Sequence, residues 1–190
     1  MIRYLITDGC ASRDPAAWFE NLQCWMREGV DFVQIREPDL MPRELSAIVK
    51  RVCAIKDETR VVVNDRTDIA IAAYADGVHL RDGSIEPERI RRIAARPLFI
   101  SVSCHGVPEV AAAARSGADL ALLAPIFPPI SKIATRPPLG LEALREAAGR
   151  VEIPVIALGG ITQGNAGACI EAGAAGVGGI SLFSPHAKRD

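Results

Sequence analysis

Short apolar runs alternate with amphipathic stretches along the whole chain. The clearest run, from Ile153 to Leu158, is continuous, which is typical of a strand covered on both faces. A glycine pair, Gly159 and Gly160, follows it directly. By the same criterion, strands are predicted at 2–7, 30–35, 60–63, 77–80, 98–102, 120–124, 153–158 and 176–182.

The stretches between these runs have helical spacing. Within 15–28 the apolar residues Trp18, Leu22 and Trp25 recur at intervals of three and four, and Gly29 ends the pattern. On this spacing, together with capping and turn residues, helices are predicted at 15–28, 42–55, 67–74, 85–95, 108–116, 141–148 and 162–172.

Strict alternation of strand and helix predicts a parallel sheet, and eight strands predict its closure into a (β/α)8 TIM barrel. The alternative, an open doubly wound sheet, lacks support because Asp8-Gly9-Cys10 after the first strand is no dinucleotide-binding fingerprint. No linker interrupts 1–190, so a single domain is expected. Too few residues follow Phe183 for an eighth helix. We therefore expect the final helix to be missing or shortened, with a homodimer partner as one candidate cover for that surface.

Composition narrows the class of protein. The chain has 190 residues, 49% of them hydrophobic, which is enough for one well-filled domain. Its net charge of −1 offers no basic footprint for nucleic acid. The five cysteines are scattered without a CxxC pair, as in a protein with reduced thiols. No run is long enough to span a bilayer, and the start is too polar for a signal peptide. We expect a cytoplasmic protein with neither nucleic-acid nor membrane partners.

Candidate chemistry lies at the carboxyl ends of the predicted strands, where parallel barrels bind their ligands. Gln34 and Arg36 alternate with Ile35, so both can point into the barrel mouth. An inward arginine suits phosphate or pyrophosphate, although Arg36 could instead pair with Glu37 or Asp65. Asn64 and Asp65 supply oxygen ligands of the kind that a magnesium-bound pyrophosphate needs. The alternative is that they form an ordinary turn that caps the next helix. Lys132 lies in a proline-rich loop of the kind that covers active sites.

Two glycine pairs end the chain's last two strands. Gly159-Gly160 follows the run at 153–158, and Gly178-Gly179 precedes Ile180-Ser181. Loops after the seventh and eighth strands of barrels commonly hold a phosphate on backbone amides. The alternative is that the glycines only permit tight turns and close packing. The residues alone support the two interpretations equally.

An ordered set of motifs at the strand ends resembles a known family. These motifs are YLITD at the start, VQIRE at 33–37, VNDRTDIAIAAYADGVHL at 63–80, SVSCH at 101–105, APIFPPISK at 124–132, PVIALGGIT, and GVGGIS near the end. Together they look like the thiamine phosphate synthase family, which also includes thiazole tautomerases. The resemblance covers nearly the whole chain and implies a (β/α)8 barrel.

The resemblance implies a reaction and a role for each matching residue. Synthases of this family join hydroxymethylpyrimidine pyrophosphate to thiazole phosphate and release pyrophosphate with the help of Mg²⁺. Asp65 would be a magnesium ligand, with Asp82 as a further candidate. Arg36, Ser103 and Lys132 would act on the pyrophosphate as the catalytic set. The substrate-binding set implied by the resemblance is Gln34, Arg36, Asn64, Ser103, Ser131, Lys132, Gly160, Ile180 and Ser181.

Several positions depart from the family pattern. Pro38 stands where a lysine is expected, and Ser84 replaces the second magnesium carboxylate. In the proline-rich loop that contains Lys132, here called the lid loop, Pro129 stands where the family has its first threonine. Pro125 occupies the position of the histidine acid/base of the tautomerase branch, and DGSIEP at 82–87 resembles that branch more than the synthases.

Three functions follow from these residues. The leading one is a magnesium-dependent transferase of thiamine biosynthesis that acts on small phosphate and pyrophosphate substrates. The alternatives are a thiazole phosphate carboxylate tautomerase and a non-catalytic protein that binds thiazole phosphate or thiamine phosphate. His79 and His105 are expected to be structural.

Overall fold

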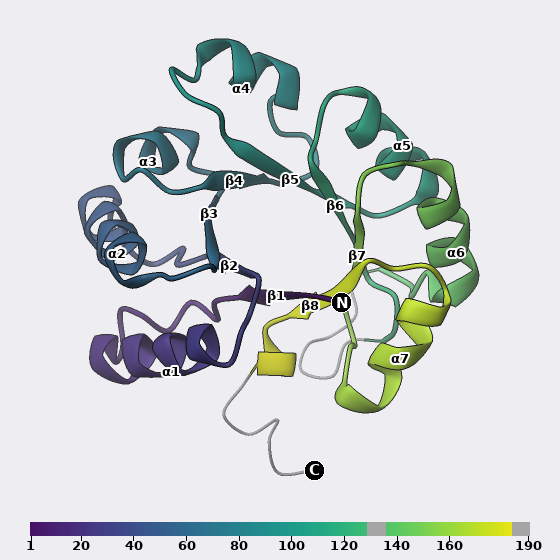
Figure 1. Ribbon diagram of the computed structural model, residues 1–190, viewed down its shortest axis with the longest axis horizontal. Coiled ribbons are helices and arrows are strands. Elements are labelled where there is room, and N and C mark those ends of the chain that lie inside the picture. Colours follow the sequence, from purple (N-terminus) through teal and green to yellow (C-terminus); the bar gives the residue numbers. More distant parts are fainter. Residues whose placement is uncertain (129–135, 184–190) are drawn as a thin grey trace.

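A closed barrel of eight parallel strands forms the centre of the computed structural model, which describes residues 1–128 and 136–183 (Figure 1). Each strand pairs with its neighbours in sequence, and β8 pairs with β1 to close the barrel. The predicted (β/α)8 fold is confirmed. The strands are β1 (Ile2–Ile6), β2 (Phe32–Ile35), β3 (Arg60–Asn64), β4 (Gly77–Leu80), β5 (Phe99–Cys104), β6 (Leu120–Leu123), β7 (Val155–Ala157) and β8 (Gly176–Gly179).

Helices surround the barrel, one after each strand up to β7 (Figure 1). They are α1 (Pro15–Arg27), α2 (Pro42–Ile55), α3 (Thr67–Ala72), α4 (Pro87–Ile93), α5 (Val107–Arg115), α6 (Gly140–Arg150) and α7 (Gln163–Glu171). In the described part of the chain, β8 is followed only by a 3-10 turn, η1 (Ser181–Phe183). The expectation of a missing or shortened final helix is confirmed for these residues.

The predicted strand at 176–182 was too long. The strand ends at Gly179, and the next residues turn into η1, where the Phe183 amide donates to the Ile180 carbonyl at 3.2 Å. This turn buries the Phe183 ring against Trp25 in an edge-on contact, with ring centroids 5.4 Å apart. The apolar residues after Gly179 therefore cover the side of the barrel next to α1 instead of extending the sheet.

Apolar packing divides into the barrel interior and the layer between sheet and helices. Inside the barrel, the rings of Tyr4 and Phe32 stack at 5.4 Å, and Phe99 packs against Phe32 at 4.9 Å. Leu122 and Ile156 belong to the same interior cluster. Because side chains alternate along a strand, the residues between these face outward onto the helices. The interior also buries the polar side chains of Gln34, His79 and Ser101, each of which lies beyond the start of its strand.

Local signals in the sequence set where the helices begin. Thr162 caps α7 as predicted, since its hydroxyl accepts from the Asn165 amide at 3.2 Å. The Asn165 side chain accepts from the Thr162 amide at 2.8 Å, completing a capping box. Asp14 caps α1 in a similar way, through the Ala17 amide at 3.0 Å. These caps fix the helix starts that follow β7 and β1 at the carboxyl face.

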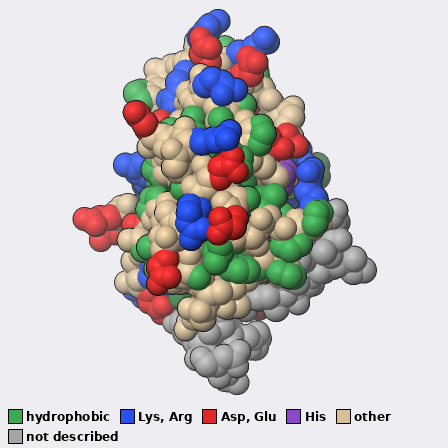
Figure 2. All heavy atoms as spheres, turned by 90° about the vertical axis from the view of Figure 1, so that its right-hand side faces the viewer, with side chains coloured by type: hydrophobic (Ala, Val, Ile, Leu, Met, Phe, Trp, Pro, Cys, Tyr) green, Lys and Arg blue, Asp and Glu red, His purple; other side chains and the backbone are tan. Residues whose placement is uncertain are grey.

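The outer surface carries charges of both signs. On α6, Arg145 pairs with Glu142 at 2.8 Å and Arg150 with Glu146 at 2.6 Å. Figure 2 shows basic and acidic side chains interspersed with apolar ones over one side of the molecule. Among the described helices, none combines the length and apolarity that crossing a membrane requires.

Candidate active site

Two amides from neighbouring strands meet inside the barrel mouth. Gln34 on β2 is 2% exposed, and its Nε2 donates to Asn64 Oδ1 on β3 at 2.8 Å. The predicted inward orientation of Gln34 is consistent with this bond. Gln34 Oε1 is buried and has no hydrogen-bond partner among the described residues. A buried acceptor without a partner is costly, so this oxygen is suited to accept from a donor on a ligand.

Arg36 follows β2, and its backbone amide donates to the Thr7 hydroxyl at 2.9 Å. The two carboxylates that could have neutralised its side chain are engaged elsewhere. Glu37 is buried and accepts from the Ala11 amide at 2.9 Å and from Trp18 Nε1 at 3.0 Å. Asp65 pairs with a different arginine, Arg81. Within the described ranges the Arg36 guanidinium has no ion-pair partner, which favours the anion-binding interpretation over an internal salt bridge.

Asp65 stands in a tight turn after β3 with a backbone φ of 61°. Its carboxylate accepts from Arg81 Nε at 2.5 Å and from the Ser84 hydroxyl at 2.9 Å. Partial burial acts to raise the pKa of Asp65, but the bonds from Ser84 and Arg81 and the charge of Arg81 outweigh it, so this pKa is lowered. Asp65 is therefore ionised at neutral pH, as a metal ligand must be.

The β4–α4 loop and the end of β5 share a small cavity of about 290 Å³. Its lining includes Asp82, Ser84 and Ser103. The structure thus brings together the residue that replaces the second magnesium carboxylate and a predicted pyrophosphate contact. Asp82 itself lies 4.0 Å from the Arg136 guanidinium. Among the described residues, no group of three His, Cys, Asp or Glu side chains could hold a metal ion.

Ser103 is tied to a buried histidine. Its hydroxyl lies 2.8 Å from His79 Nε2 on the neighbouring strand β4. His79 Nδ1 lies 2.9 Å from the Ser101 hydroxyl, which in turn lies 3.0 Å from the Tyr4 hydroxyl on β1. Burial lowers the pKa of His79 from 6.5 to about 4, with the charge of Asp65 opposing the shift. His79 is thus neutral at physiological pH.

The first glycine pair packs tightly against the loop after β6. A Cβ atom on Gly159 would lie 2.7 Å from the Pro125 Cα, and one on Gly160 would lie 2.4 Å from the Pro128 carbonyl oxygen. Both residues also have positive φ, 85° and 65°. Close packing and turn geometry therefore account for both glycines, which supports the interpretation that needs no ligand. Whether Gly160 also binds a phosphate stays a prediction.

The other predicted phosphate residues lie beside α1. Ile180 and Ser181 line a cavity of about 420 Å³ together with Thr7, Asp8 and residues of α1. A larger cavity, of about 1040 Å³, opens at the opposite end of the barrel, where Phe32 and Leu120 begin their strands. Parallel barrels carry their active sites at the carboxyl ends of the strands. We therefore assign no function to the larger cavity.

The lid loop lies mostly outside the residues that the structure describes. Ser131 and Lys132, both predicted to contact the pyrophosphate, and Pro129 lie between the described ranges 1–128 and 136–183. Their roles stay predictions from the family resemblance.

Sequence reasoning missed two residues of the site. The first is Arg81, which pairs with Asp65 across the β3 and β4 ends. The second is Tyr4, which joins Ser101, His79 and Ser103 in one chain of hydrogen bonds. The sequence did indicate Ser101, because Ser101 and Ser103 alternate along β5 and must face the same side.

Comparison with known proteins identifies the class to which this fold and site belong. The family model described as thiamine monophosphate synthase matches residues 3–183. The chain belongs to the thiamine phosphate synthase family.

Individual relatives agree with this assignment. A protein from Aquifex aeolicus, with the provisional name thiamine-phosphate synthase 2, is 40% identical over 95% of this chain and 96% of its own length. Thiamine-phosphate synthase from Methanoregula boonei is 38% identical over 94% of this chain and 83% of its own length. The solved structure of thiamine phosphate pyrophosphorylase from Pyrococcus furiosus superimposes with a TM-score of 0.83 at 30% identity, covering 99% of this chain and 90% of that one.

Proposed function

We propose that the protein is a thiamine phosphate synthase, which joins hydroxymethylpyrimidine pyrophosphate to thiazole phosphate and releases pyrophosphate. The observation that carries the proposal is the polar set at the barrel mouth, where Gln34 bonds to Asn64 and Arg36 follows Gln34 by two residues. The amides of Gln34 and Asn64 offer neutral donors and acceptors for a heterocycle. Arg36 offers a positive charge for the pyrophosphate attached to it. The names of the relatives do not favour the tautomerase and binding-protein alternatives.

Each side chain has a specific task in this proposal. Gln34 and Asn64 hold the pyrimidine ring, with the unpartnered Gln34 Oε1 accepting from a ring substituent. The Arg36 guanidinium donates two parallel hydrogen bonds to the pyrophosphate, a geometry that lysine cannot provide. The hydroxyl of Ser103 and the amine of Lys132 contact the pyrophosphate as well. Gly160, Ile180 and Ser181 hold the phosphate of the thiazole.

The carboxylates at the site suit a magnesium ion that the protein and the substrate pyrophosphate hold together. Mg²⁺ in proteins is commonly held by one or two carboxylates and by phosphate oxygens of the substrate, and it keeps several waters. Asp65 offers one ionised carboxylate, whose ion pair with the exposed Arg81 is weak enough for a divalent cation to displace. When bound, magnesium would neutralise part of the charge on the pyrophosphate. Asp82 is a further candidate ligand.

The reaction forms one bond and breaks one. The carbon–oxygen bond to pyrophosphate breaks, and its electron pair leaves with the pyrophosphate. The thiazole nitrogen then donates its lone pair to the pyrimidine methylene carbon, so no oxidant or reductant is required. Arg36, Ser103 and Lys132 stabilise the negative charge that develops on the departing group, which is often the largest contribution to such catalysis.

A coupling assay tests the proposed function directly. Purified protein is incubated with hydroxymethylpyrimidine pyrophosphate and thiazole phosphate, with and without Mg²⁺, and thiamine phosphate is followed by chromatography. We expect product only when Mg²⁺ is present. Absence of product, with thiazole phosphate still bound in calorimetry, would contradict the synthase and favour the tautomerase or binding-protein alternative.

Replacing Ser84 by aspartate is expected to raise magnesium-dependent turnover at subsaturating Mg²⁺ by about tenfold. The Ser84 hydroxyl is 2.9 Å from Asp65 Oδ1, so the substitution puts a second carboxylate beside the first. Two like charges at this distance repel in the absence of metal and attract a divalent cation. The measurement is turnover against Mg²⁺ concentration for wild type and Ser84→Asp.

Ser84→Asn is the matched control, because it has nearly the same size as aspartate but no charge. We expect the asparagine variant to need as much Mg²⁺ as the wild type. An unchanged Mg²⁺ requirement in Ser84→Asp would mean that this position does not face the metal.

The remaining expectations from the sequence stay proposals. We propose that the protein acts in the cytoplasm on small phosphate and pyrophosphate substrates. A homodimer that covers the barrel next to η1 is a further prediction, which sedimentation analysis of the purified protein would test.

A further inference from the structure

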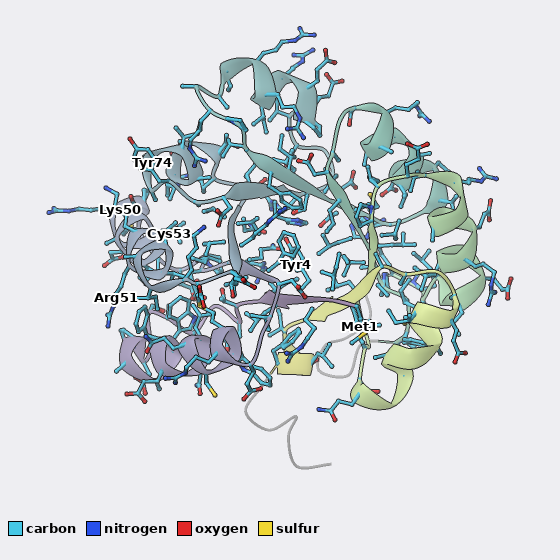
Figure 3. The ribbon with its side chains drawn as sticks, in the orientation of Figure 1. Met1, Tyr4, Lys50, Arg51, Cys53 and Tyr74 are labelled. Atoms are coloured by element: carbon cyan, nitrogen blue, oxygen red, sulfur yellow. The ribbon has the colours of Figure 1, made fainter. Side chains whose placement is uncertain are left out.

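A continuous chain of hydrogen bonds crosses the barrel interior. It starts at the Tyr4 hydroxyl on β1, passes through Ser101 on β5 and His79 on β4, and ends at Ser103 on β5. In Figure 3 the labelled Tyr4 side chain projects from β1 into the middle of the barrel. Tyr4 and Ser101 are fully buried, whereas Ser103 is only partly buried at the carboxyl end. One end of the chain is therefore closed and the other faces the candidate active site.

The closed end determines the direction of the bonds. The Tyr4 phenol remains protonated, because burial raises its pKa well above the ordinary value. Its hydroxyl has Ser101 as its hydrogen-bond partner, and among the described residues no other acceptor is within reach. If Ser101 donated to Tyr4, the phenolic proton would be buried without an acceptor, which is unfavourable. Tyr4 therefore donates to Ser101.

The remaining bonds follow from this first one. The Ser101 oxygen accepts from Tyr4, and the acceptor left for its own buried proton among the described residues is His79 Nδ1. If Nδ1 donated instead, the Ser101 proton would be buried without an acceptor, so Ser101 donates to His79 Nδ1. A neutral imidazole carries one proton, and with Nδ1 accepting, that proton resides on Nε2. Nε2 then donates to the Ser103 oxygen. Every buried donor in the chain has an acceptor in this arrangement, and the only proton left over belongs to Ser103.

We propose that His79 is a positioning residue: with its proton on Nε2 it donates to Ser103, and so keeps the Ser103 hydroxyl proton free to hydrogen-bond an anionic oxygen of a ligand in the barrel mouth. The reverse order would turn Ser103 into a donor to His79 and present only lone pairs to the ligand, which would repel an anion. This inference rests on the proposed function in one respect, the identification of that ligand as a pyrophosphate.

The tautomer can be measured without any activity. Nitrogen-15 NMR of labelled protein at pH 7.5 distinguishes a protonated from an unprotonated ring nitrogen. We expect a protonated Nε2 and an unprotonated Nδ1 for His79. His105 serves as an internal reference for a protonated Nδ1, because its Nδ1 lies 2.8 Å from the Ala124 carbonyl oxygen, which can only accept. A protonated Nδ1 on His79 would overturn the proposal.

The effect on the ligand is tested with Ser101→Ala. Ser101 is fully buried, so it acts on a ligand only through His79. Its loss removes the donor to Nδ1, lets the second tautomer form, and draws the Ser103 proton toward Nε2. We expect magnesium pyrophosphate to bind roughly three- to tenfold more weakly, because a hydrogen bond to a charged group is partly lost. Thiazole phosphate affinity should not change.

Thr59→Val is the matched control, since the buried Thr59 hydroxyl bonds to the Val30 carbonyl at 2.9 Å and lies at the end of the barrel opposite the mouth. We expect wild-type binding from it. Wild-type pyrophosphate affinity in Ser101→Ala would overturn the proposal even with the expected tautomer. Failure of the wild type to bind pyrophosphate would count against the proposed function and the ligand assignment together, whereas the wrong tautomer with intact binding would refute this inference alone.

Discussion

Replacing Arg36 by alanine should weaken binding of hydroxymethylpyrimidine pyrophosphate by about 100-fold or more and leave thiazole phosphate binding intact. A hydrogen bond to a charged group contributes about 1.5–3 kcal/mol, and a guanidinium makes two of them to one pyrophosphate. A loss of about 3 kcal/mol corresponds to roughly 100-fold in affinity. Isothermal calorimetry with each substrate alone, in the presence of Mg²⁺, measures both values.

The structure indicates that this variant will fold. The backbone amide of Arg36, not its side chain, makes the bond to Thr7, and Glu37 holds the β1–α1 loop independently. Arg51→Ala is a suitable control, because Arg51 is stacked on the Phe19 ring, with its guanidinium carbon 3.7 Å from the ring centroid, and takes no part in the site. Equal loss of both ligands in a folded Arg36→Ala protein would rule out two separate sites.

Arg36→Lys separates charge from geometry. Lysine keeps the positive charge but lacks the planar fork, so we expect an intermediate loss of about tenfold. An affinity equal to that of the wild type would mean that only the net charge at this position matters.

Hydrophobic patterning was sufficient to predict the fold, because each strand and helix can be recognised from residues close together in the sequence. A buried parallel strand such as β7 must be apolar on both faces, and helices such as α2 need an apolar stripe. Strict alternation then leaves few topologies. The prediction went wrong at 176–182, because an apolar run does not reveal whether its residues extend a sheet or, like Phe183, bury a ring against a neighbouring helix.

The candidate site was predictable only where local spacing controls it. Alternation around Ile35 predicted that Gln34 points into the barrel mouth, and its bond to Asn64 agrees with this. The hydrogen bond between Tyr4 and Ser101 joins residues 97 positions apart, and the periodicity of the sequence does not predict contacts of this kind. Likewise, nothing in the sequence indicates that Asp65 pairs with Arg81 and not with Arg36, because that choice depends on the turns that follow β3 and β4.

Acidification should destabilise the protein through His79. In the unfolded chain the pKa of a histidine is near 6.5, whereas burial lowers the pKa of folded His79 to about 4. Between these values the unfolded state binds more protons than the folded state, so the free energy of unfolding falls as the pH falls. The stabilisation is fully present above about pH 6.5 and is lost by about pH 4, a total of about 3 kcal/mol for this one side chain.

The contribution of His79 is isolated by comparison with His79→Gln. Glutamine keeps a donor and an acceptor but does not titrate, while Asp65, which faces His79, and the other histidines are common to both proteins. The measurement is urea unfolding at steps from pH 7.5 to pH 4.5, without Mg²⁺. We expect the wild type to lose about 2–3 kcal/mol more than the variant over this range. Parallel stability curves would mean that His79 protonates in the folded protein, and the buried imidazole would then be charged and unable to accept from Ser101.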